Sequence, residues 1–150
     1  MSIDQSDEMS IGTLLFIAQR AFEEDIVAAL HASGFEFTLA QGRLAARIAE
    51  NGSRLTDLAS AAGITKQSAA YLVNQLETAG LISRHDDPHD ARAQLVLLTE
   101  HGIHAQQAAR KIEADIEARW QKFLGEHEFS ALKKQLVTLR EQVDRHDPTH

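Results

Sequence analysis

The chain has 150 residues, is 43% hydrophobic, contains no cysteine and carries a formal net charge of -7. This length suits one domain with one core, and the apolar content argues against disorder. The absence of cysteine excludes disulfides, thiolate metal sites and cysteine nucleophiles. No apolar run approaches the roughly 20 residues of a membrane span, and the acidic N-terminus is unlike a secretory signal. We therefore expect a cytoplasmic protein that makes no contact with membranes.

The N-terminal third predicts two helices. From Met9 to His31, apolar residues recur in steps of three and four, which is typical of a helix with one apolar stripe. Ser33-Gly34 should end this helix, because glycine accepts the left-handed conformation. The segment Thr38-Leu39-Ala40-Gln41 fits a capping box and should open a second helix that stops at Asn51-Gly52.

Two short helices separated by a glycine turn follow. Thr56 can cap a helix over residues 57–62, and Gly63 should break it. Thr65 can cap the next helix, which should run to about Ala79. A helix, a turn of about three residues containing glycine, and a second helix form the helix-turn-helix signature, in which the second helix enters the major groove of DNA.

A predicted hairpin comes directly after this helix pair. Residues 81–85 and 93–98 are β-prone, and the segment between them is rich in aspartate and contains Pro88, which favours a turn. A hairpin in this place is the wing of a winged helix. We therefore expect a mostly α fold with a small β-hairpin wing.

The C-terminal part predicts two more helices. Thr99 should cap a long helix that reaches Leu124, and Gly125 should end it. A last helix should run from about Glu126 to Arg145 with its apolar residues at heptad spacing. Since the terminal helices carry more apolar surface than one lobe can cover, we expect a homodimer. The alternative is that the two helices pack on each other within one chain. The heptad residues are Phe129, Leu132, Leu136, Leu139 and Val143.

Polar side chains on the outer face of the second short helix are candidate DNA contacts. The amides of Gln67 and Asn74 can pair with adenine in the major groove. Lys66 lies at the helix start, where backbone amides and the helix dipole attract phosphate, and the hydroxyls of Thr65 and Ser68 can bind phosphate oxygens. The full candidate set is Arg54, Thr65, Lys66, Gln67, Ser68, Ala70, Tyr71, Asn74, Arg84, His89, Asp90 and Arg92.

Two arginines flank the tip of the predicted wing. An arginine such as Arg92 or Arg84 at a hairpin tip can enter a narrow minor groove, where the potential is most negative. Asp90 lies two residues before Arg92 and could pair with it and fix its direction. The alternative is a charged surface turn with a weak ion pair.

Three segments of the chain resemble the MarR family of bacterial regulators. They are Leu55-Thr56-Asp57-Leu58-Ala59, Leu76-Glu77-Thr78-Ala79-Gly80-Leu81-Ile82, and Asp87-Pro88-His89-Asp90-Ala91-Arg92-Ala93 leading to Leu98-Thr99-Glu100-His101-Gly102. The resemblance covers nearly the whole chain. It implies a single MarR-like chain over 1–150, with a DNA-binding winged helix-turn-helix lobe over 36–99 and dimerisation helices over 9–31 and 100–145. Ala91 departs from the pattern, since many relatives carry a second basic residue there.

The resemblance also implies a function. Family members are homodimers in which two winged lobes grip a pseudo-palindromic operator, and we expect such a regulator here rather than an enzyme. Asp90 and Arg92 match the wing pair of the family, and Lys66 to Asn74 supply the groove contacts. Many members are repressors that release DNA when a small, often phenolic, ligand binds between the dimerisation helices and the lobe. The candidate lining residues are Phe16, Arg20, Phe35 and Phe37, with the arginine holding a carboxylate and the phenylalanines an aromatic ring.

Charge and histidine content leave two alternatives open. Residues 54–92 contain four basic and five acidic residues, so the lobe is not strongly basic, which favours a helical protein-interaction module. His101 and His104 on one helix, or His85 and His89 in the wing, would suit a metal-responsive regulator, but neither pair has a four-ligand set. We therefore expect no metal site and no cofactor. No phosphate loop, serine elbow or pair of carboxylates indicates an enzyme.

Overall fold

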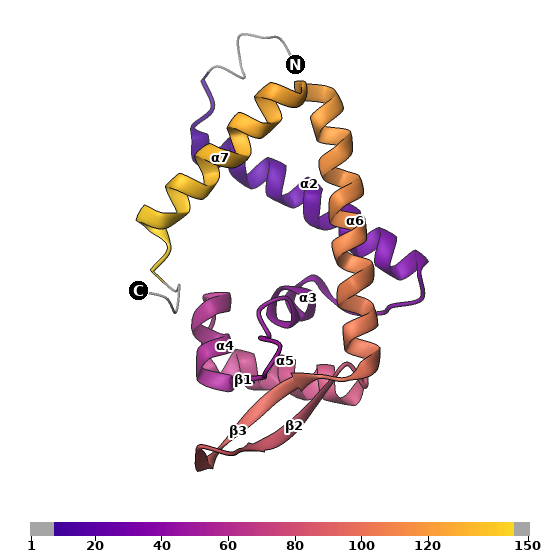
Figure 1. The fold of residues 1–150 in the computed structure, drawn as a ribbon, viewed down its shortest axis with the longest axis vertical. Helices are drawn as coiled ribbons and strands as arrows, with labels where there is room; N and C mark the ends of the chain where they lie inside the picture. Colours follow the sequence, from indigo (N-terminus) through magenta and orange to yellow (C-terminus); the bar gives the residue numbers. More distant parts are fainter. Residues whose placement is uncertain (1–7, 146–150) are drawn as a thin grey trace.

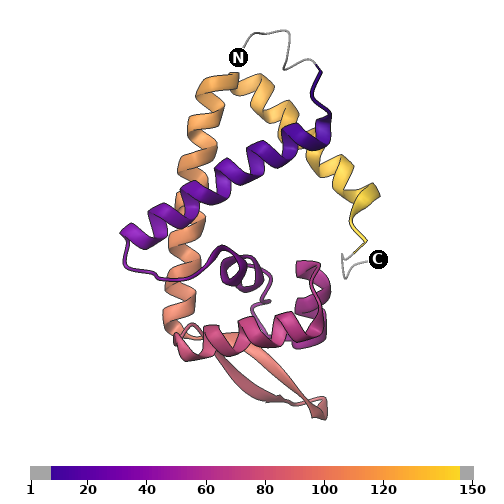
Figure 2. The same ribbon diagram turned by 180° about the vertical axis from the view of Figure 1, so that it is seen from behind.

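The computed structural model describes residues 8–145, which contain six helices and one three-stranded antiparallel sheet. Three helices form the upper part: α2 (Ile11–Ala32), α6 (Glu100–Leu124) and α7 (Glu126–Val143). Helix α2 crosses α6, and α7 turns back sharply from the end of α6 at Gly125 (Figures 1 and 2). The predicted mostly α fold with a hairpin wing is confirmed.

The lower lobe begins with α3 (Leu39–Ala45), which follows the predicted capping box. The hydroxyl of Thr38 accepts the N–H of Gln41, and the side chain of Gln41 accepts the N–H of Thr38. Helix α3 ends at Ala45, well before the predicted stop. The N–H groups of Arg47 and Ile48 bond to carbonyls only three residues back, so the helical turn tightens and stops there.

The helix-turn-helix consists of α4 (Leu55–Ala62) and α5 (Lys66–Thr78). The predicted cap of α4 is wrong: Arg54 occupies the N-cap position without a side-chain hydrogen bond, and Thr56 lies inside the first turn. Gly63 adopts φ 66° between the helices, a left-handed conformation that suits glycine. The cap of α5 is confirmed, because the side chain of Thr65 accepts the N–H of Ser68.

The wing is a hairpin of β2 (Ile82–Asp87) and β3 (Asp90–Leu98), which are longer than predicted. A third strand, β1 (Ser53–Arg54), pairs with β3, so that the sheet order is β1-β3-β2. The sequence did not predict β1, because two residues are too short to show a strand pattern. This strand joins the base of the wing to the start of α4.

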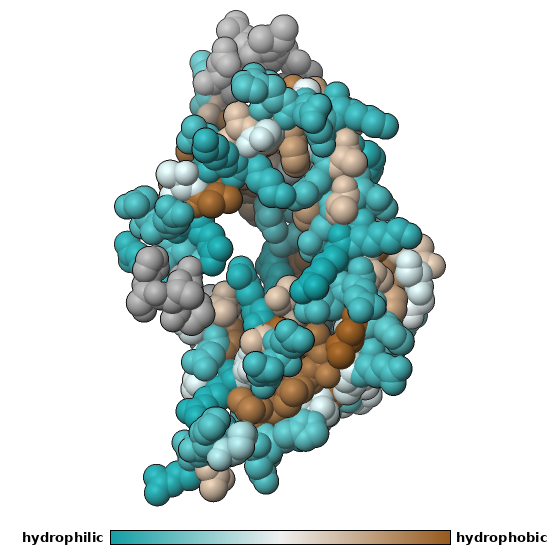
Figure 3. Space-filling view, in the orientation of Figure 1, coloured by the Kyte–Doolittle hydropathy of each residue, from teal (hydrophilic) through white to brown (hydrophobic). Residues whose placement is uncertain are grey.

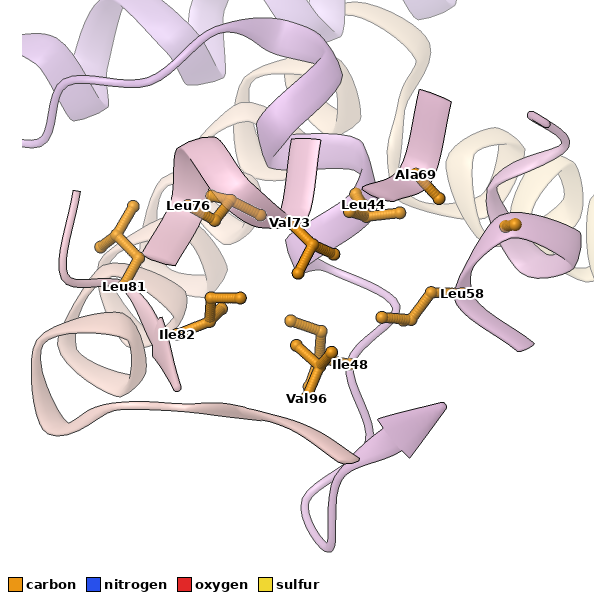
Figure 4. Packing of buried hydrophobic residues seen from close by; sticks show 10 residues of the cluster. Leu44, Ile48, Leu58, Ala69, Val73, Leu76, Leu81, Ile82 and Val96 are labelled. Carbon is orange, nitrogen blue, oxygen red and sulfur yellow. The ribbon is translucent and has the colours of Figure 1, made fainter. Parts of the chain in front are cut away.

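The hydrophobic core lies inside the lobe, and α5 supplies its centre (Figure 4). Val73 and Leu76 of α5 are 0% and 1% exposed. They lie among buried residues of α3, α4 and the sheet, including Leu44, Leu58 and Val96. Because the inner face of α5 is committed to this core, its opposite face is turned outward.

The upper helices pack differently from the lobe. Ile116 of α6 is buried, and Phe22 of α2 meets Trp120 of α6 edge-to-face, with ring centroids 5.4 Å apart. Helix α7 by contrast has no buried residue, and its Leu132 and Leu136 are 40% and 41% exposed. An opening separates α7 from the lobe in the space-filling view (Figure 3). Within residues 8–145 no helix is long and apolar enough to cross a membrane.

Candidate nucleic-acid interface and cavity

The exposed start of α5 gathers four of the predicted contact residues. Lys66 and Gln67 are exposed in the first turn. The hydroxyl of Thr65 caps this turn and also donates to Ser68 Oγ at 2.9 Å. These two hydroxyls are therefore ordered against each other, next to the free N–H groups of the helix terminus, where an anion is favoured.

Tyr71 extends the same face and is held by a chain of hydrogen bonds from α3. Gln75 Nε2 donates to Tyr71 Oη, and Gln41 Nε2 donates to Gln75 Oε1, both at 2.9 Å. Gln41 Oε1 in turn accepts the N–H of Thr38. Since the phenol oxygen of Tyr71 accepts a bond, its own hydrogen is left to donate elsewhere, and the residue is 64% exposed.

Two predicted DNA contacts lie against each other in the structure. Arg84 Nη2 of β2 donates to Asn74 Oδ1 of α5, and Arg84 Nε lies 3.5 Å from Glu77 Oε2. Arg84 is therefore partly committed to α5 rather than free at the wing tip. The bond also orients the Asn74 amide, so that its nitrogen is the group left to meet a partner.

Arg54 also makes an internal contact. Its Nε and Nη2 donate to Asp87 Oδ2 at 2.9 and 2.6 Å, and Asp87 Oδ1 accepts the N–H of His89 at 2.9 Å. Asp87 is 6% exposed. The N–H of His89 and then the Arg54 guanidinium hold the pKa of Asp87 below its ordinary value, and Asp87 raises the pKa of Arg54. The pair joins β1 to the end of β2 and fixes the hairpin tip.

Arg92 projects from the start of β3 and is exposed. Asp90 Oδ1 accepts the backbone N–H of Arg92 at 3.0 Å, so this aspartate orders the turn rather than the guanidinium. In the described part of the chain no ion pair holds the Arg92 side chain. Its charge is free to meet a phosphate or a groove.

A cavity of about 370 Å³ lies between helices α2 and α6 and the lobe, and α3 forms part of its wall. Of the predicted lining residues only Phe37 belongs to its wall. Phe35 lies at a second, smaller hollow, where its ring meets that of His101 at 5.4 Å. Phe16 is 61% exposed near the start of α2, with the guanidinium of Arg20 over its ring at 5.6 Å. The structure therefore does not bring these four residues together.

The cavity wall contains an ion pair that the sequence pattern does not predict. Arg43 of α3 donates from Nε and Nη2 to the two carboxylate oxygens of Glu23 of α2, at 2.8 and 2.5 Å. Gln19 Nε2 adds a third bond to Glu23 at 2.7 Å. The hydrogen bond from Arg43 lowers the pKa of Glu23 against the opposing effect of burial, and Glu23 raises the pKa of Arg43. One feature of the sequence nevertheless points to this ion pair. Glu23 lies seven residues before Leu30 and so falls on the apolar stripe of α2, where a charged residue needs a partner.

The histidines do not converge on a metal site in the described residues. No group of three or more His, Asp or Glu side chains within residues 8–145 could hold an ion. The ring of His101 lies against that of Phe35 at a tilt of 33°, and His85 Nε2 lies 2.8 Å from Ser83 Oγ.

Comparison with known proteins agrees with this geometry. A sequence model described as the MarR family matches residues 35–93. A crystal structure of MarR is 25% identical, with a TM-score of 0.77 over 91% of this chain and 99% of that chain. The transcriptional repressor CouR, bound to a 23-mer DNA duplex, is 27% identical, with a TM-score of 0.74 over 93% and 97%. NadR in complex with 4-hydroxyphenylacetate is 26% identical, with a TM-score of 0.69 over 88% and 93%.

The family match covers the helix-turn-helix and most of the wing, and the structural likeness extends to the terminal helices. Residues 35–93 of this chain match the MarR family, and its fold resembles those of the solved MarR, CouR and NadR structures.

Proposed function

We propose that this protein binds double-stranded DNA sequence-specifically, with α5 in the major groove and the β2–β3 hairpin beside it. The observation that carries the proposal is the outer face of α5, which remains exposed while Val73 and Leu76 are buried beneath it. The description of CouR as bound to a DNA duplex supports it. Residues 36–99 form the DNA-binding lobe in this proposal.

The contacts divide by chemistry. No hydrogen bond within the described residues holds the Gln67 side chain, so its amide is free to read a base edge. Asn74 presents its amide nitrogen, because Arg84 binds its oxygen. Arg92 supplies the wing contact. The remaining roles are phosphate binding by Thr65, Lys66, Ser68 and Tyr71, close approach at Ala70, and shaping of the wing by Arg54, Arg84, His89 and Asp90.

The active form is a homodimer, made by the helices over residues 9–31 and 100–145. The apolar residues of α7 support this, since Leu136, Leu139 and Val143 are 41%, 43% and 60% exposed. Ile11 and Phe16 of α2 add 73% and 61% exposed apolar side chains. A two-fold dimer that places its recognition helices about 34 Å apart matches one turn of DNA and a pseudo-palindromic operator.

The protein acts as a repressor that a small aromatic molecule releases from DNA. CouR is described as a repressor, and NadR as a complex with 4-hydroxyphenylacetate. The cavity of about 370 Å³ joins the upper helices to the lobe. A molecule that binds better to the DNA-free arrangement of these parts shifts the population away from DNA binding.

Selection of bound duplexes from a random pool tests the proposal. We expect enrichment of an inverted repeat and a complex that weakens steeply with salt, since each phosphate contact releases counterions. A protein-interaction module would enrich no sequence and give no salt-sensitive, site-specific complex. Repeating the selection with aromatic compounds tests the release.

A further inference from the structure

The most deeply buried charged group in the wall of the cavity between α2, α3 and α6 is a carboxylate. Glu23 is 8% exposed and lines the cavity together with Phe22 and Phe37. The remaining wall is mostly aliphatic, with Ile26 and Leu30 of α2 among its residues. An apolar chamber with aromatic rings and one deep anionic group is the chemistry that binds organic cations.

The two partners of the ion pair differ in exposure. The side chain of Glu23 is 10% exposed, whereas that of Arg43 is 58% exposed. If a ligand replaces Arg43, the guanidinium turns into water that it already contacts. If a ligand replaces Glu23, the carboxylate is left buried and without its partner, which is strongly unfavourable. The arginine is therefore the partner that is easier to displace.

We infer that the cavity takes a hydrophobic cation, an aromatic amine or amidine, whose charged group replaces Arg43 at Glu23. This inference rests on the proposed effector role of the cavity and assigns the charge of its ligand. It differs from the sequence-based expectation of a carboxylate held by Arg20, which lies outside this cavity. Arg110 and Glu113 are both exposed in the cavity wall. They carry opposite charges and therefore do not favour a ligand of either sign.

The same exchange reaches the DNA-binding face through α3. Arg43 joins α3 to α2, and Gln41 joins α3 to Gln75 of α5. A cation at Glu23 removes the first link and frees α3 from the dimerisation helices. Gln41 also lines the cavity, so a shift of α3 is passed directly to the recognition helix.

Three naphthalene probes of matched shape test the charge preference: 2-(1-naphthyl)ethylammonium, 2-(1-naphthyl)ethanol and 3-(1-naphthyl)propionate. Titration calorimetry on the full chain without DNA should show saturable binding of the ammonium probe, at least tenfold tighter than the other two. Tighter binding of the propionate, or no binding of the ammonium probe, overturns the inference.

Two substitutions give effects of opposite sign. Glu23→Gln should weaken binding of the ammonium probe at least tenfold and leave binding of the neutral alcohol unchanged. Arg43→Gln removes the competing cation and should tighten binding of the ammonium probe. If the ion pair is merely structural, both substitutions weaken binding alike, which overturns the inference. Thermal melts of both variants show whether they are folded.

Operator binding without any probe is measured separately by fluorescence anisotropy. Failure there contradicts the proposed DNA-binding function whatever the probes do. Glu23-dependent binding of the ammonium probe that leaves a functional operator complex intact supports the cation site and contradicts release by ligand.

Discussion

Arg54 holds the buried carboxylate of Asp87 through two nitrogens, 33 residues away along the chain. The contact joins the short strand β1 to the end of β2, so that the wing cannot pivot freely about its base. We therefore expect Arg54 to affect DNA binding indirectly, by shaping the wing.

The first prediction concerns acid stability. Because the folded-state pKa of Asp87 lies below its unfolded value of about 3.9, its stabilisation is present above that pH. It is lost as the pH falls through the lowered folded pKa. The unfolding free energy of the wild type should therefore rise with pH over this range. The contribution of Asp87 to that rise should be missing in Asp87→Asn. Denaturant unfolding from pH 2.5 to 6 measures it, and Asp86→Asn, at an exposed neighbour, should keep the wild-type profile.

The second prediction concerns the joint between the wing and α6. A Cβ atom on Gly102 would lie 2.0 Å from the Leu81 carbonyl oxygen, which also accepts the N–H of Thr99 at 3.1 Å. Gly102→Ala should therefore lower the free energy of unfolding by about 1–3 kcal/mol, since neighbouring backbone must move. Gly12→Ala in α2 is the control, because its Cβ meets only Ser10 Oγ at 3.8 Å. This change should gain about 0.5–1 kcal/mol. Equal melting temperatures for the two variants would contradict the tight joint.

Local signals in the sequence predicted where helices α3, α5 and α6 begin. The caps at Thr38, Thr65 and Thr99 each need only a hydroxyl and a backbone N–H three residues later, and all three form. The wing was predictable because two β-prone runs flank a turn. Strand β1 was not, because its pairing depends on the distant residues Leu95 and Val96.

The candidate site was less predictable than the fold. Exposure of Gln67 and Tyr71 follows from helical periodicity, which the sequence displays. The pairing of Glu23 with Arg43, 20 residues apart, depends on how α2 and α3 pack, which periodicity does not specify. Periodicity also does not specify which turn of α2 lines the cavity. Phe16 and Arg20 lie too far toward the start of α2 to reach it, contrary to expectation.

The third prediction separates positioning from reading of DNA. Arg92→Ala should weaken binding to all duplexes alike and lower the slope of log K against log salt by about 1. Gln67→Ala should cost about 1–3 kcal/mol on the selected operator alone, and the loss should map to one base pair in each half-site. Anisotropy titrations against the operator and a scrambled duplex measure both. If Gln67→Ala weakens binding to the operator and to the scrambled duplex equally, Gln67 does not contact a base.

The fourth prediction concerns the dimer. Leu136→Glu places a charge in the apolar row of α7, where each buried leucine contributes about 1.5–3 kcal/mol and two-fold symmetry doubles the effect. We expect a monomer in sedimentation velocity and loss of operator binding. Lys134→Glu, two residues away, is the control, because it changes the charge of α7 by at least as much as Leu136→Glu does. A dimeric Leu136→Glu variant would exclude α7 from the interface.

The last prediction tests whether Gln75 acts through Tyr71. Gln75 Nε2 donates to Tyr71 Oη, which leaves the phenol hydrogen free to donate to an acceptor on DNA in the proposed complex. Tyr71→Phe removes this hydrogen, and Gln75→Met removes the donor that orients it while preserving side-chain length. Each change should weaken operator binding about three- to tenfold, because a typical hydrogen bond contributes about 0.5–1.5 kcal/mol net.

A double-mutant cycle decides between coupling and independence. If Gln75 acts only by orienting the hydroxyl, Gln75→Met costs nothing further once Tyr71 is phenylalanine, and the coupling energy exceeds about 0.5 kcal/mol. Additive losses would mean that Gln75 contacts DNA itself or supports the fold, and thermal melts of Gln75→Met separate these two cases. Because Gln75 is bonded to Gln41 of the cavity wall, coupling in this cycle would also make Tyr71 the point where a shift of α3 first reaches the DNA.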